Sequence, residues 1–404
     1  MKILVLNAGS SSQKSCLYQL NDSLPDLPIE PLWEAKVNWT YQQGTAELKV
    51  KTLKGAVLQE ELPSDRRSEI VSRMLNTLCQ GDTQVIDRLS EIDIVGHRVV
   101  HGGQDYRQST IVTPEVKDAI IHLANFAPVH NPANLEGIEA IEQILPDVPQ
   151  VAVFDTAFHS QLPLKAAVYP IPYSFFEQGI RRYGFHGINH QYCAERTAQL
   201  LNKGIKSLRL ITCHLGNGCS LAAIKDGISI DTTMGFTPLE GLMMGSRSGS
   251  VDPGILIHLE REYNYDADKL DEMLNKASGL KGISGISNDI RQIFAASKDN
   301  SRAQLAIDMY VRSLVQHIGA MLVTLGGLDA LIFTGGVGEN QPYIRAAACA
   351  ALEFIGVKID LGKNANTPID KDIATTESSA RVLVIQAQED WAIAKECWKI
   401  AKMQ

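Results

Sequence analysis

Residues 3–12 read ILVLNAGSSS, and residues 208–220 read LRLITCHLGNGCS. In each stretch a short apolar run leads into a turn of glycine and small polar residues, and a second apolar run follows, at 16–18 and at 221–224. Such a turn leaves backbone N–H groups exposed and lets a phosphate approach without meeting a Cβ. The repeated strand–turn–strand unit therefore predicts two duplicated halves that hold a nucleotide in a cleft between them.

The size of the chain and its alternation of elements predict two α/β domains. A chain of 404 residues is longer than one hydrophobic core usually supports. Alternating strand-like and helix-like segments are typical of the α/β class. We expect a first domain over residues 1–157, which a C-terminal helix at 390–404 rejoins, and a second domain over residues 158–389.

The spacing of apolar residues predicts individual elements along the chain. We expect a long loop over 231–253 and a turn over 279–287. The expected strands are a hairpin within 1–20, antiparallel strands within 44–61, and strands at 93–96, 150–154, 208–213, 328–333 and 382–385. The expected helices are 66–80, 114–125, 135–145, 190–202, 253–262, 267–278, 303–324, 342–353 and 390–402.

Composition narrows the classes of partner and the compartment. The formal net charge of −8 argues against nucleic acid as the main partner. The seven cysteines contain no C-x-x-C pair, which is typical of free thiols in a reducing compartment, and we expect a cytoplasmic protein. Residues 318–338 carry a single charge, Asp329, but Gly326 and Gly327 with this aspartate split the stretch, so we do not expect a membrane span. Only four apolar residues separate Met1-Lys2 from Asn7, too few for a signal-peptide core, so we expect no targeting segment.

Several longer blocks identify a family. Residues 7–14, NAGSSSQK, and 231–249, DTTMGFTPLEGLMMGSRSG, resemble the two signatures of the acetate kinases in the acetokinase family. The other blocks that resemble this family, in the same order, are 96–103 (GHRVVHGG), 154–159 (FDTAFH), 182–187 (RYGFHG), 214–218 (HLGNG) and 336–340 (GVGEN). The departures are Gln13, where an apolar residue is common, small changes at Thr233, Ser246 and Ser250, and a less acidic run, 386–388, before Glu389.

The resemblance implies a fold, an activity and partners. The implied fold has two duplicated domains of the actin-like and ribonuclease H-like ATPase type around a central nucleotide cleft. The implied activity is the Mg²⁺-dependent, reversible transfer of the ATP γ-phosphoryl group to acetate, giving acetyl phosphate and ADP, with Mn²⁺ as a possible replacement. The resemblance also implies a homodimer.

Four side chains are candidates for the chemistry. Arg98 and Arg247 lie in glycine-rich loops, and a guanidinium offers two parallel donors to a carboxylate or phosphate. By resemblance, Arg98 contacts acetate or acetyl phosphate, Arg247 and His186 stabilise the transferring phosphoryl group, and Asp155 is an active-site acid. Without the resemblance, ion-paired arginines, a structural histidine and a helix-capping aspartate explain the same residues.

The remaining candidates bind metal, nucleotide or the acyl group. By resemblance, Asn7 and Glu389 bind the metal, although a carboxylate at the start of a helix is favourable in any case. The expected nucleotide ligands are Ser10, Ser12, Lys14, His214, Leu215, Gly216, Asn217, Gly218, Asp289, Ile290, Arg291, Gly336, Val337, Gly338, Glu339 and Asn340. The expected acyl pocket contains Val100, Val129, Phe185 and Pro238.

Two alternatives to an acetate kinase stay open. One is a propionate or butyrate kinase of the same family, since one extra methylene changes binding in an apolar pocket by only about 1–3 kcal/mol. The other is an actin-like ATPase whose ATP turnover is independent of any carboxylate and needs no Arg98. The arginine and histidine loops favour a kinase, because an ATPase has no use for them.

Overall fold

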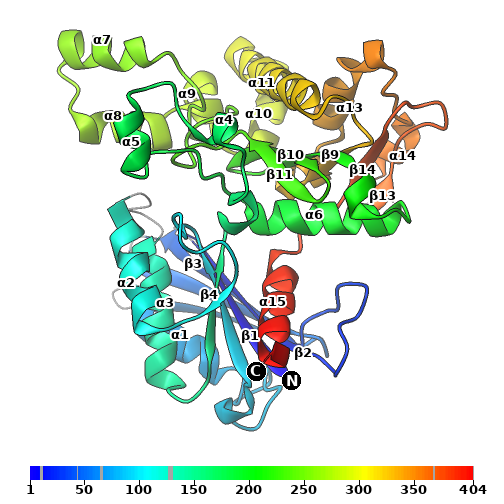
Figure 1. The fold of residues 1–404 in the computed structure, drawn as a ribbon. Helices are drawn as coiled ribbons and strands as arrows, with labels where there is room; N and C mark the ends of the chain where they lie inside the picture. Colours follow the sequence, from blue (N-terminus) through cyan, green and yellow to red (C-terminus); the bar gives the residue numbers. More distant parts are fainter. Residues whose placement is uncertain (10–11, 43, 64–66, 126–130, 367–368, 404) are drawn as a thin grey trace. The chain divides into compact units, whose positions relative to one another are not determined.

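The computed structural model describes residues 1–9, 12–42, 44–63, 67–125, 131–366 and 369–403. The chain divides into two compact units (Figure 1). Unit 1 contains Met1–Ala157 and Gln388–Gln404, and unit 2 contains Phe158–Ala387. The chain therefore enters unit 2 once and returns to unit 1 through the segment that precedes the C-terminal helix.

Unit 1 is built on a mixed sheet with the strand order β5-β4-β3-β2-β1-β6-β8-β7. The first strands form an antiparallel meander, whereas β6 and β8 run parallel to β1. Residues 3–6 of β1 are all buried, as expected for a central strand that is covered on both faces. The strands are β1 (Lys2–Ala8), β2 (Ser12–Gln19), β3 (Trp33–Gln42), β4 (Thr45–Thr52), β5 (Val57–Pro63), β6 (Ile94–Val99), β7 (Thr110–Ile111) and β8 (Gln150–Phe154).

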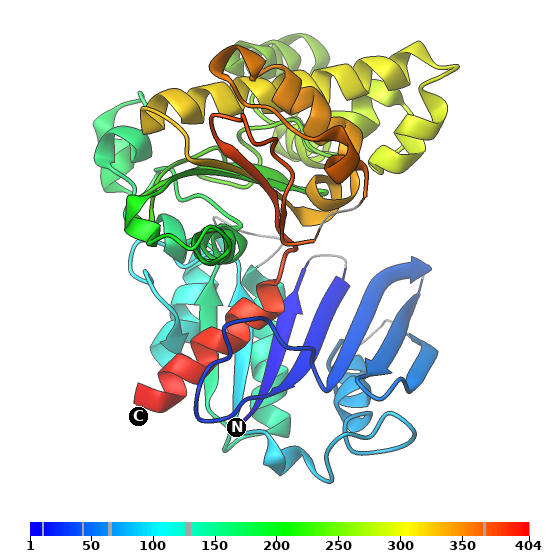
Figure 2. The ribbon, with the colours of Figure 1, turned by 90° about the vertical axis from the view of Figure 1, so that its right-hand side faces the viewer.

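Helices cover both faces of the unit 1 sheet. Helices α1 (Arg67–Asn76), α2 (Pro114–His122) and α3 (Asn131–Ile144) lie on one side, and the C-terminal α15 (Glu389–Met403) lies on the other (Figure 2). The helix expected over 66–80 ends earlier, at Asn76; Ile70, Met74 and Leu75 form its buried face, and Leu78 is buried just past its end. On the other side, α15 packs so closely on β6 that a Cβ at Gly96 would lie 2.4 Å from the Sγ atom of Cys397.

Unit 2 repeats this strand order in a sheet of six strands, β11-β10-β9-β12-β14-β13. In both sheets the first strand of the unit pairs antiparallel with the second and parallel with the strand on its other side. The duplicated α/β class predicted from the two glycine turns is confirmed. The strands are β9 (Arg209–Leu215), β10 (Cys219–Lys225), β11 (Ile228–Thr232), β12 (Ala330–Thr334), β13 (Lys371–Asp372) and β14 (Arg381–Val384).

Helices α6 and α11 lie on opposite faces of the unit 2 sheet (Figure 1). The helices of this unit are α4 (Leu164–Ala167), α5 (Tyr173–Glu177), α6 (Gly187–Leu200), α7 (Pro253–Tyr263), α8 (Ala267–Lys276), α9 (Gly279–Ser284), α10 (Ile290–Ala296), α11 (Ser301–Leu325), α12 (Gly335–Asn340), α13 (Pro342–Ala350) and α14 (Leu361–Ala365). Among the helices that the structure describes, none combines the length and the apolarity needed to cross a membrane.

The structure corrects two local expectations and places one more glycine-rich stretch in a helix. The turn expected over 279–287 begins with helix α9, and the glycine-rich stretch 336–340 lies in the short helix α12. Glycine-rich composition hid the helical repeat in α9, where Leu280 and Ser284, four residues apart, are both buried. Helix α6 starts at Gly187 rather than at residue 190, because His186 adopts a left-handed backbone conformation (φ 57°) just before it.

Candidate active site

The first glycine turn connects β1 and β2. The backbone N–H of Gly9 donates to the carbonyl of Ser12 at 2.8 Å, which closes the turn. Ser10 lies outside the described residues. Past the turn, Lys14 contacts the carboxylates of Asp390 at 2.7 Å and Glu34 at 3.3 Å. Burial opposes the charge of Lys14, but its neighbours, of which Asp390 contributes most, together outweigh burial and raise the pKa of this lysine above its usual range. This candidate phosphate ligand is thus held by carboxylates.

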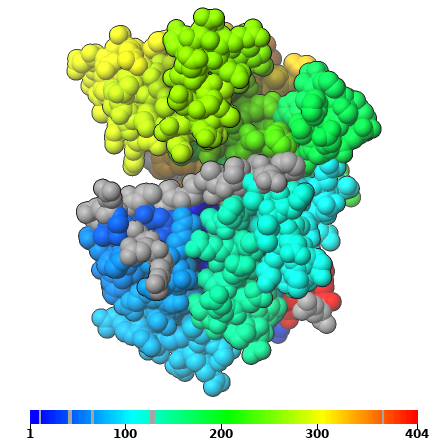
Figure 3. Space-filling view, turned by 90° about the vertical axis from the view of Figure 1, so that its left-hand side faces the viewer, coloured from blue at the N-terminus to red at the C-terminus, as the bar shows by residue number. Residues whose placement is uncertain are grey.

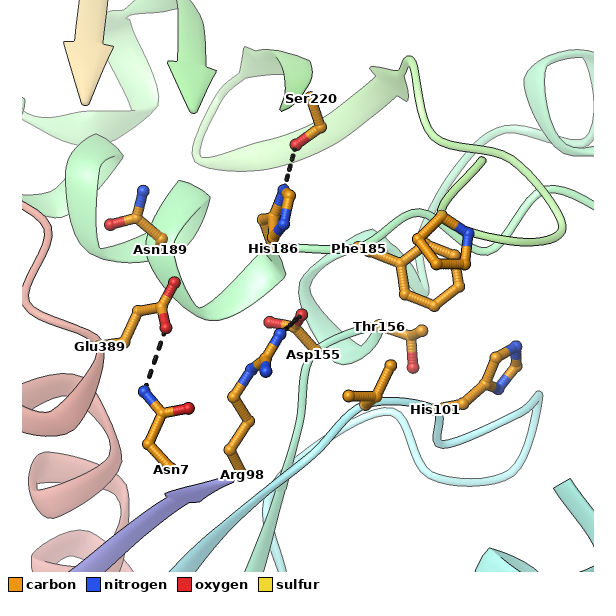
Figure 4. Close-up of polar contacts among 12 residues, drawn as sticks. Asn7, Arg98, His101, Asp155, Thr156, Phe185, His186, Asn189, Ser220 and Glu389 are labelled. Atoms are coloured by element: carbon orange, nitrogen blue, oxygen red, sulfur yellow. Dashed lines mark hydrogen bonds and ion pairs between the residues drawn. The ribbon is translucent and has the colours of Figure 1, made fainter. Parts of the chain in front are cut away.

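The proposed metal pair lies at the start of α15. The side-chain amide of Asn7 donates to Glu389 Oε2 at 3.2 Å (Figure 4) and to Asp390 Oδ1 at 3.0 Å. Asn7 thus brings two carboxylates and an amide oxygen to one place, and hard cations such as Mg²⁺ prefer oxygen donors. Among the described residues no group of three or more acidic, histidine or cysteine side chains is arranged to hold a metal. The donor set therefore fits an ion that keeps most of its waters, not a closed protein cage.

Arg98 and Asp155 form an ion pair between neighbouring strands. Arg98 lies on β6 and Asp155 follows β8, and Arg98 Nη2 donates to Asp155 Oδ2 at 2.7 Å (Figure 4). Burial opposes the charge of Arg98, but the nearby carboxylates, of which Asp155 contributes most, together outweigh burial, so the pKa of the guanidinium is raised. Arg98 Nε is buried and has no hydrogen-bond partner within the described ranges. The ion pair thus holds the guanidinium in its charged form and leaves the N–H at Nε as a further hydrogen-bond donor.

The loop after β6 is fixed by side chains that the sequence did not single out. Three consecutive backbone N–H groups, in residues 100–102, donate to side-chain oxygens of Asn134, Asn131 and Thr156, each at 3.1 Å. These bonds set the direction of the chain beyond Arg98 and hold Val100, which is buried. The only sequence signal was two asparagines near the start of a helix. Val129 lies outside the described residues.

In unit 2, His186 is presented by a strained turn before α6. Gly184 has φ +79° and packs so tightly that a Cβ there would lie 2.6 Å from Thr232 and 2.7 Å from the ring of His159. His186 Nδ1 lies 2.9 Å from Ser220 Oγ (Figure 4), and its ring stacks on His214 with 4.1 Å between centroids. The sequence pattern of small residues around His186 thus corresponds to a close approach of the backbone to its neighbours.

Further imidazoles lie behind His186. His190 contacts Ser220 Oγ through Nε2 and Thr212 Oγ1 through Nδ1, at 2.7 and 2.6 Å. Burial lowers the pKa of His190 well below its usual range, so this ring is neutral. The amide of Asn189 donates to His214 Nδ1 at 2.8 Å, which places the proton of a neutral His214 on Nε2. His190 and Asn189 were not among the sequence candidates.

The second glycine turn brings Arg247 next to His186. A Cβ at Gly218 would lie 3.3 Å from Arg247 Nη1 and 3.4 Å from His186 Cε1, so both side chains flank this glycine. Arg247 Nη1 also donates to the carbonyl of Pro238 at 3.1 Å. Asn217 ties the turn to the Arg247 loop, because its carbonyl accepts from the N–H of Gly245 at 3.1 Å.

The other nucleotide candidates lie at the start of α10 and within the short helix α12. Asp289 caps α10 and pairs with the exposed Arg291 at 2.6 Å, which lowers the pKa of this aspartate. Glu339 Oε1 accepts from the N–H groups of Gly335 and Ala387, both at 2.9 Å, while burial raises the pKa of the carboxyl. Glu339 thus links α12 to the last residue of unit 2. The side chains of Leu215 and Ile290 lie in the core.

Arg345 is a functional candidate that the sequence gave no reason to choose. Its side chain is fully buried and donates to the carbonyls of Gly338 at 2.8 Å and Glu339 at 2.7 Å, and to both oxygens of Asn364. Burial lowers its pKa to about 10. Arg345 therefore fixes the end of α12 from inside the core.

Comparisons with known proteins agree over nearly the whole chain. The model of the acetokinase family matches residues 2–395. An acetate kinase from Nostoc punctiforme is 64% identical over 404 residues, which cover 100% of both chains. The crystal structure of Porphyromonas gingivalis acetate kinase superposes with a TM-score of 0.90 at 40% identity, over 99% of each chain. A propionate kinase from Francisella tularensis also gives a TM-score of 0.90, at 37% identity, over 98% of this chain and 99% of that one.

Proposed function

The chain belongs to the acetokinase family, and we propose that it catalyses the reversible transfer of the γ-phosphoryl group of ATP to acetate, giving acetyl phosphate and ADP. A carboxylate oxygen attacks the γ-phosphorus, the bond to the β-phosphate oxygen breaks, and ADP leaves. Acetate is already ionised at neutral pH, so no strong general base is needed. The residues must instead align the reactants and neutralise charge on the phosphoryl oxygens.

The observation that carries this proposal is the pair of donors at Gly218. Arg247 and His186 both lie within contact distance of the position that a side chain would fill there. Because Gly218 has no side chain, a phosphate that approaches this backbone meets a guanidinium and an imidazole together. Such donors, already held in position, stabilise the charge that develops on the phosphoryl group during its transfer.

Arg98 is the donor that we assign to acetate and acetyl phosphate. Asp155 occupies Nη2 and so fixes the plane of the guanidinium, while Nε has no hydrogen-bond partner in the described part of the chain. A planar fork held in this way suits a carboxylate better than a flexible ammonium does. For the acyl group we propose contacts with Val100, Phe185 and Pro238.

We further infer that Mg²⁺ accompanies the nucleotide, with Mn²⁺ as the alternative. Asn7 and Glu389 would hold the ion, since they offer the oxygen donors that it prefers. When bound, the metal neutralises charge on the β- and γ-phosphates. The residues that we assign to the nucleotide are Ser12, Lys14, His214, Leu215, Gly216, Asn217, Gly218, Asp289, Ile290, Arg291, Gly336, Val337, Gly338, Glu339 and Asn340.

A homodimer in the cytoplasm completes the proposal. Helix α7 contains no buried residue, and Ile255, Ile257 and Tyr263 on it are 49%, 48% and 63% exposed. This segment, yellow-green in Figure 3, therefore offers apolar surface of the kind that marks a protein interface. All seven cysteines are free thiols, which supports a reducing compartment.

The test is a comparison of short carboxylic acids. The purified enzyme is given ATP, Mg²⁺ and acetate, propionate or butyrate, and the acyl phosphate is trapped with hydroxylamine. We expect the highest kcat/KM for acetate and a slower reaction with propionate. Equal or better rates with propionate would favour the second candidate, which the match to the Francisella tularensis propionate kinase supports. ATP turnover without any carboxylate would favour the ATPase.

A matched pair of arginine variants tests the assignment at Gly218. Arg247→Ala should fold normally and lose turnover by orders of magnitude, because it removes a donor to the phosphoryl group. Arg312→Ala is the control, since Arg312 is exposed on α11 in the same unit. Near-normal turnover in Arg247→Ala would remove this residue from the mechanism.

A further inference from the structure

A line of hydrogen bonds runs from His186 into the core of unit 2. His186 Nδ1 lies 2.9 Å from Ser220 Oγ, Ser220 Oγ lies 2.7 Å from His190 Nε2, and His190 Nδ1 lies 2.6 Å from Thr212 Oγ1. Ser220, His190 and Thr212 are all fully buried. Their positions follow from the fold, because His186 and His190 are four residues apart at the start of α6, while Thr212 and Ser220 lie on the adjacent strands β9 and β10.

Each of these three hydrogen bonds needs one hydrogen, and counting hydrogens restricts the arrangement. His190 is neutral because it is buried, so it carries a single N–H. If that N–H is at Nε2, it donates to Ser220, Ser220 donates to His186 Nδ1, and the hydroxyl of Thr212 donates to His190 Nδ1. Every hydrogen then has an acceptor, and His186 carries its own proton on Nε2.

The reverse arrangement leaves one buried group unsatisfied. If His186 carries a proton on Nδ1, it donates to Ser220, Ser220 donates to His190 Nε2, and His190 donates from Nδ1 to Thr212. The hydroxyl hydrogen of Thr212 then needs another acceptor, and its only hydrogen bond within the described residues is the one to His190. A buried hydroxyl without an acceptor is costly, so this arrangement is disfavoured.

We propose that Ser220, His190 and Thr212 are positioning residues that hold His186 as the neutral tautomer protonated on Nε2. This inference rests on the proposed function of His186 as a donor to the phosphoryl group. The Nε2 atom is the one that faces the second glycine turn, since a Cβ at Gly218 would lie 3.5 Å from it. This line of hydrogen bonds from Thr212 to His186, which we call the relay, therefore supplies an N–H at that point without requiring a charged imidazole next to Arg247.

Nuclear magnetic resonance of the resting enzyme tests the tautomer directly. The chain contains 10 histidines, and the ring signals of His186 are identified by their loss in His186→Gln in protein labelled with ¹⁵N-histidine. At neutral pH we expect Nδ1 of His186 to have the chemical shift of an unprotonated nitrogen, with an excess of the Nε2–H form of about tenfold or more. A protonated Nδ1, in either the neutral or the cationic ring, would overturn the proposal.

Two substitutions at Thr212 separate positioning from mere packing. Thr212→Val keeps the shape but removes the hydroxyl, so the His186 tautomers should relax to the few-fold bias of a free imidazole. Thr212→Ser keeps the hydroxyl and should behave like the unchanged enzyme. We expect a lower kcat in Thr212→Val with KM for both substrates unchanged, and recovery in Thr212→Ser. An unaltered tautomer ratio in Thr212→Val would refute the relay.

These readouts distinguish the relay from the proposed function. The tautomer is measured without substrate, so it stands or falls whatever the enzyme phosphorylates. If the tautomer shifts in Thr212→Val but kcat does not change, the relay exists and His186 is not a phosphoryl donor, which contradicts the part of this inference that rests on the proposed function. Ser220→Ala, which breaks the line at its centre, should shift the tautomer in the same direction and gives a second test if Thr212→Val does not fold.

Discussion

Replacing Lys14 by methionine should destabilise unit 1, because Asp390 would lose its cation. Breaking a fully buried ion pair costs about 3–5 kcal/mol. Here the side chain of Asp390 is 8% exposed but that of Lys14 is 45% exposed, so water screens part of the interaction. Asp390 also keeps the hydrogen bond from Asn7 at 3.0 Å. We therefore expect Lys14→Met to lower the free energy of unfolding by about 1–3 kcal/mol.

A double-mutant cycle isolates the ion pair. Asp390→Asn removes the charge at nearly constant shape, and the chain with both substitutions should be more stable than the sum of the single changes predicts. We expect a coupling energy of about 1 kcal/mol or more between these positions. Lys402→Met is the matched control, since Lys402 is 41% exposed but its partner Asp22 lies fully in water. This control should have no measurable effect.

Tryptophan fluorescence during urea unfolding is the assay for this cycle. All four tryptophans, Trp33, Trp39, Trp391 and Trp398, belong to unit 1, so the signal reports this unit alone. Additivity of the two substitutions to within about 0.5 kcal/mol would refute the ion pair as a stabilising contact. The same variants separate two roles of Lys14, because the KM for ATP rises in Lys14→Met only if this lysine also binds phosphate.

Three further predictions concern the surroundings of the site. Burial lowers the pKa of His97 to about 4, so below pH 6.5 protonation of this ring favours the unfolded chain. The free energy of unfolding, measured with urea, should therefore fall by up to about 3 kcal/mol between pH 6.5 and pH 4, and by less in His97→Gln. Gly96→Ala should cost about 1–3 kcal/mol because its Cβ meets Cys397, and denaturation of the chain that also carries Cys397→Ala should show part of that loss recovered. Glu339→Ala should reduce hydrogen-exchange protection at the N–H of Ala387, which loses its acceptor, while protection in β10, which among the described residues makes no hydrogen bond with Glu339, stays unchanged.

Much of the fold could be predicted because its signals are local. The buried run of β1 and the glycine turn after it are adjacent in sequence, and the buried face of α1 repeats at helical spacing. Helix α9 could not be predicted, because Gly279, Gly282 and Gly285 read as a turn. What makes it a helix is tertiary: Leu280 and Ser284 are buried, and the N–H of Leu280 donates to Met244, more than thirty residues earlier.

The chemical groups of the site were predictable from motifs, whereas the residues behind them were not. Arg98, His186 and Arg247 lie in glycine-rich blocks that stand out in a single sequence. Arg345 reads as an ordinary helix arginine, since only the folded chain surrounds it with carbonyl groups. Thr212 likewise reads as one polar position in a strand, and its hydrogen bond to His190 exists only in the folded chain, where α6 brings the histidine beside it.

The duplication places different side chains at equivalent positions of the two hairpins. Asn7 in β1 and His214 in β9 are both the sixth residue of a seven-residue strand, and they pair across their hairpins with Lys14 and Ser220. Helix α15 packs on β1 and β6, and α6 packs on the corresponding strands β9 and β12.

Each of these helices begins with the polar residues that contact the hairpin. Glu389 and Asp390 of α15 contact Asn7, whereas Asn189 of α6 contacts His214, and His186 just before it contacts Ser220. The strand order therefore fixes where the two clusters of polar side chains lie, and the first turn of the covering helix decides which chemical groups each cluster contains. The carboxylates at the start of α15 suit a metal cation and Lys14, and the imidazoles at the start of α6 suit the phosphoryl group of the proposed reaction. Since α15 comes last in its unit and α6 comes early in its own, this correspondence follows spatial position and not sequence order.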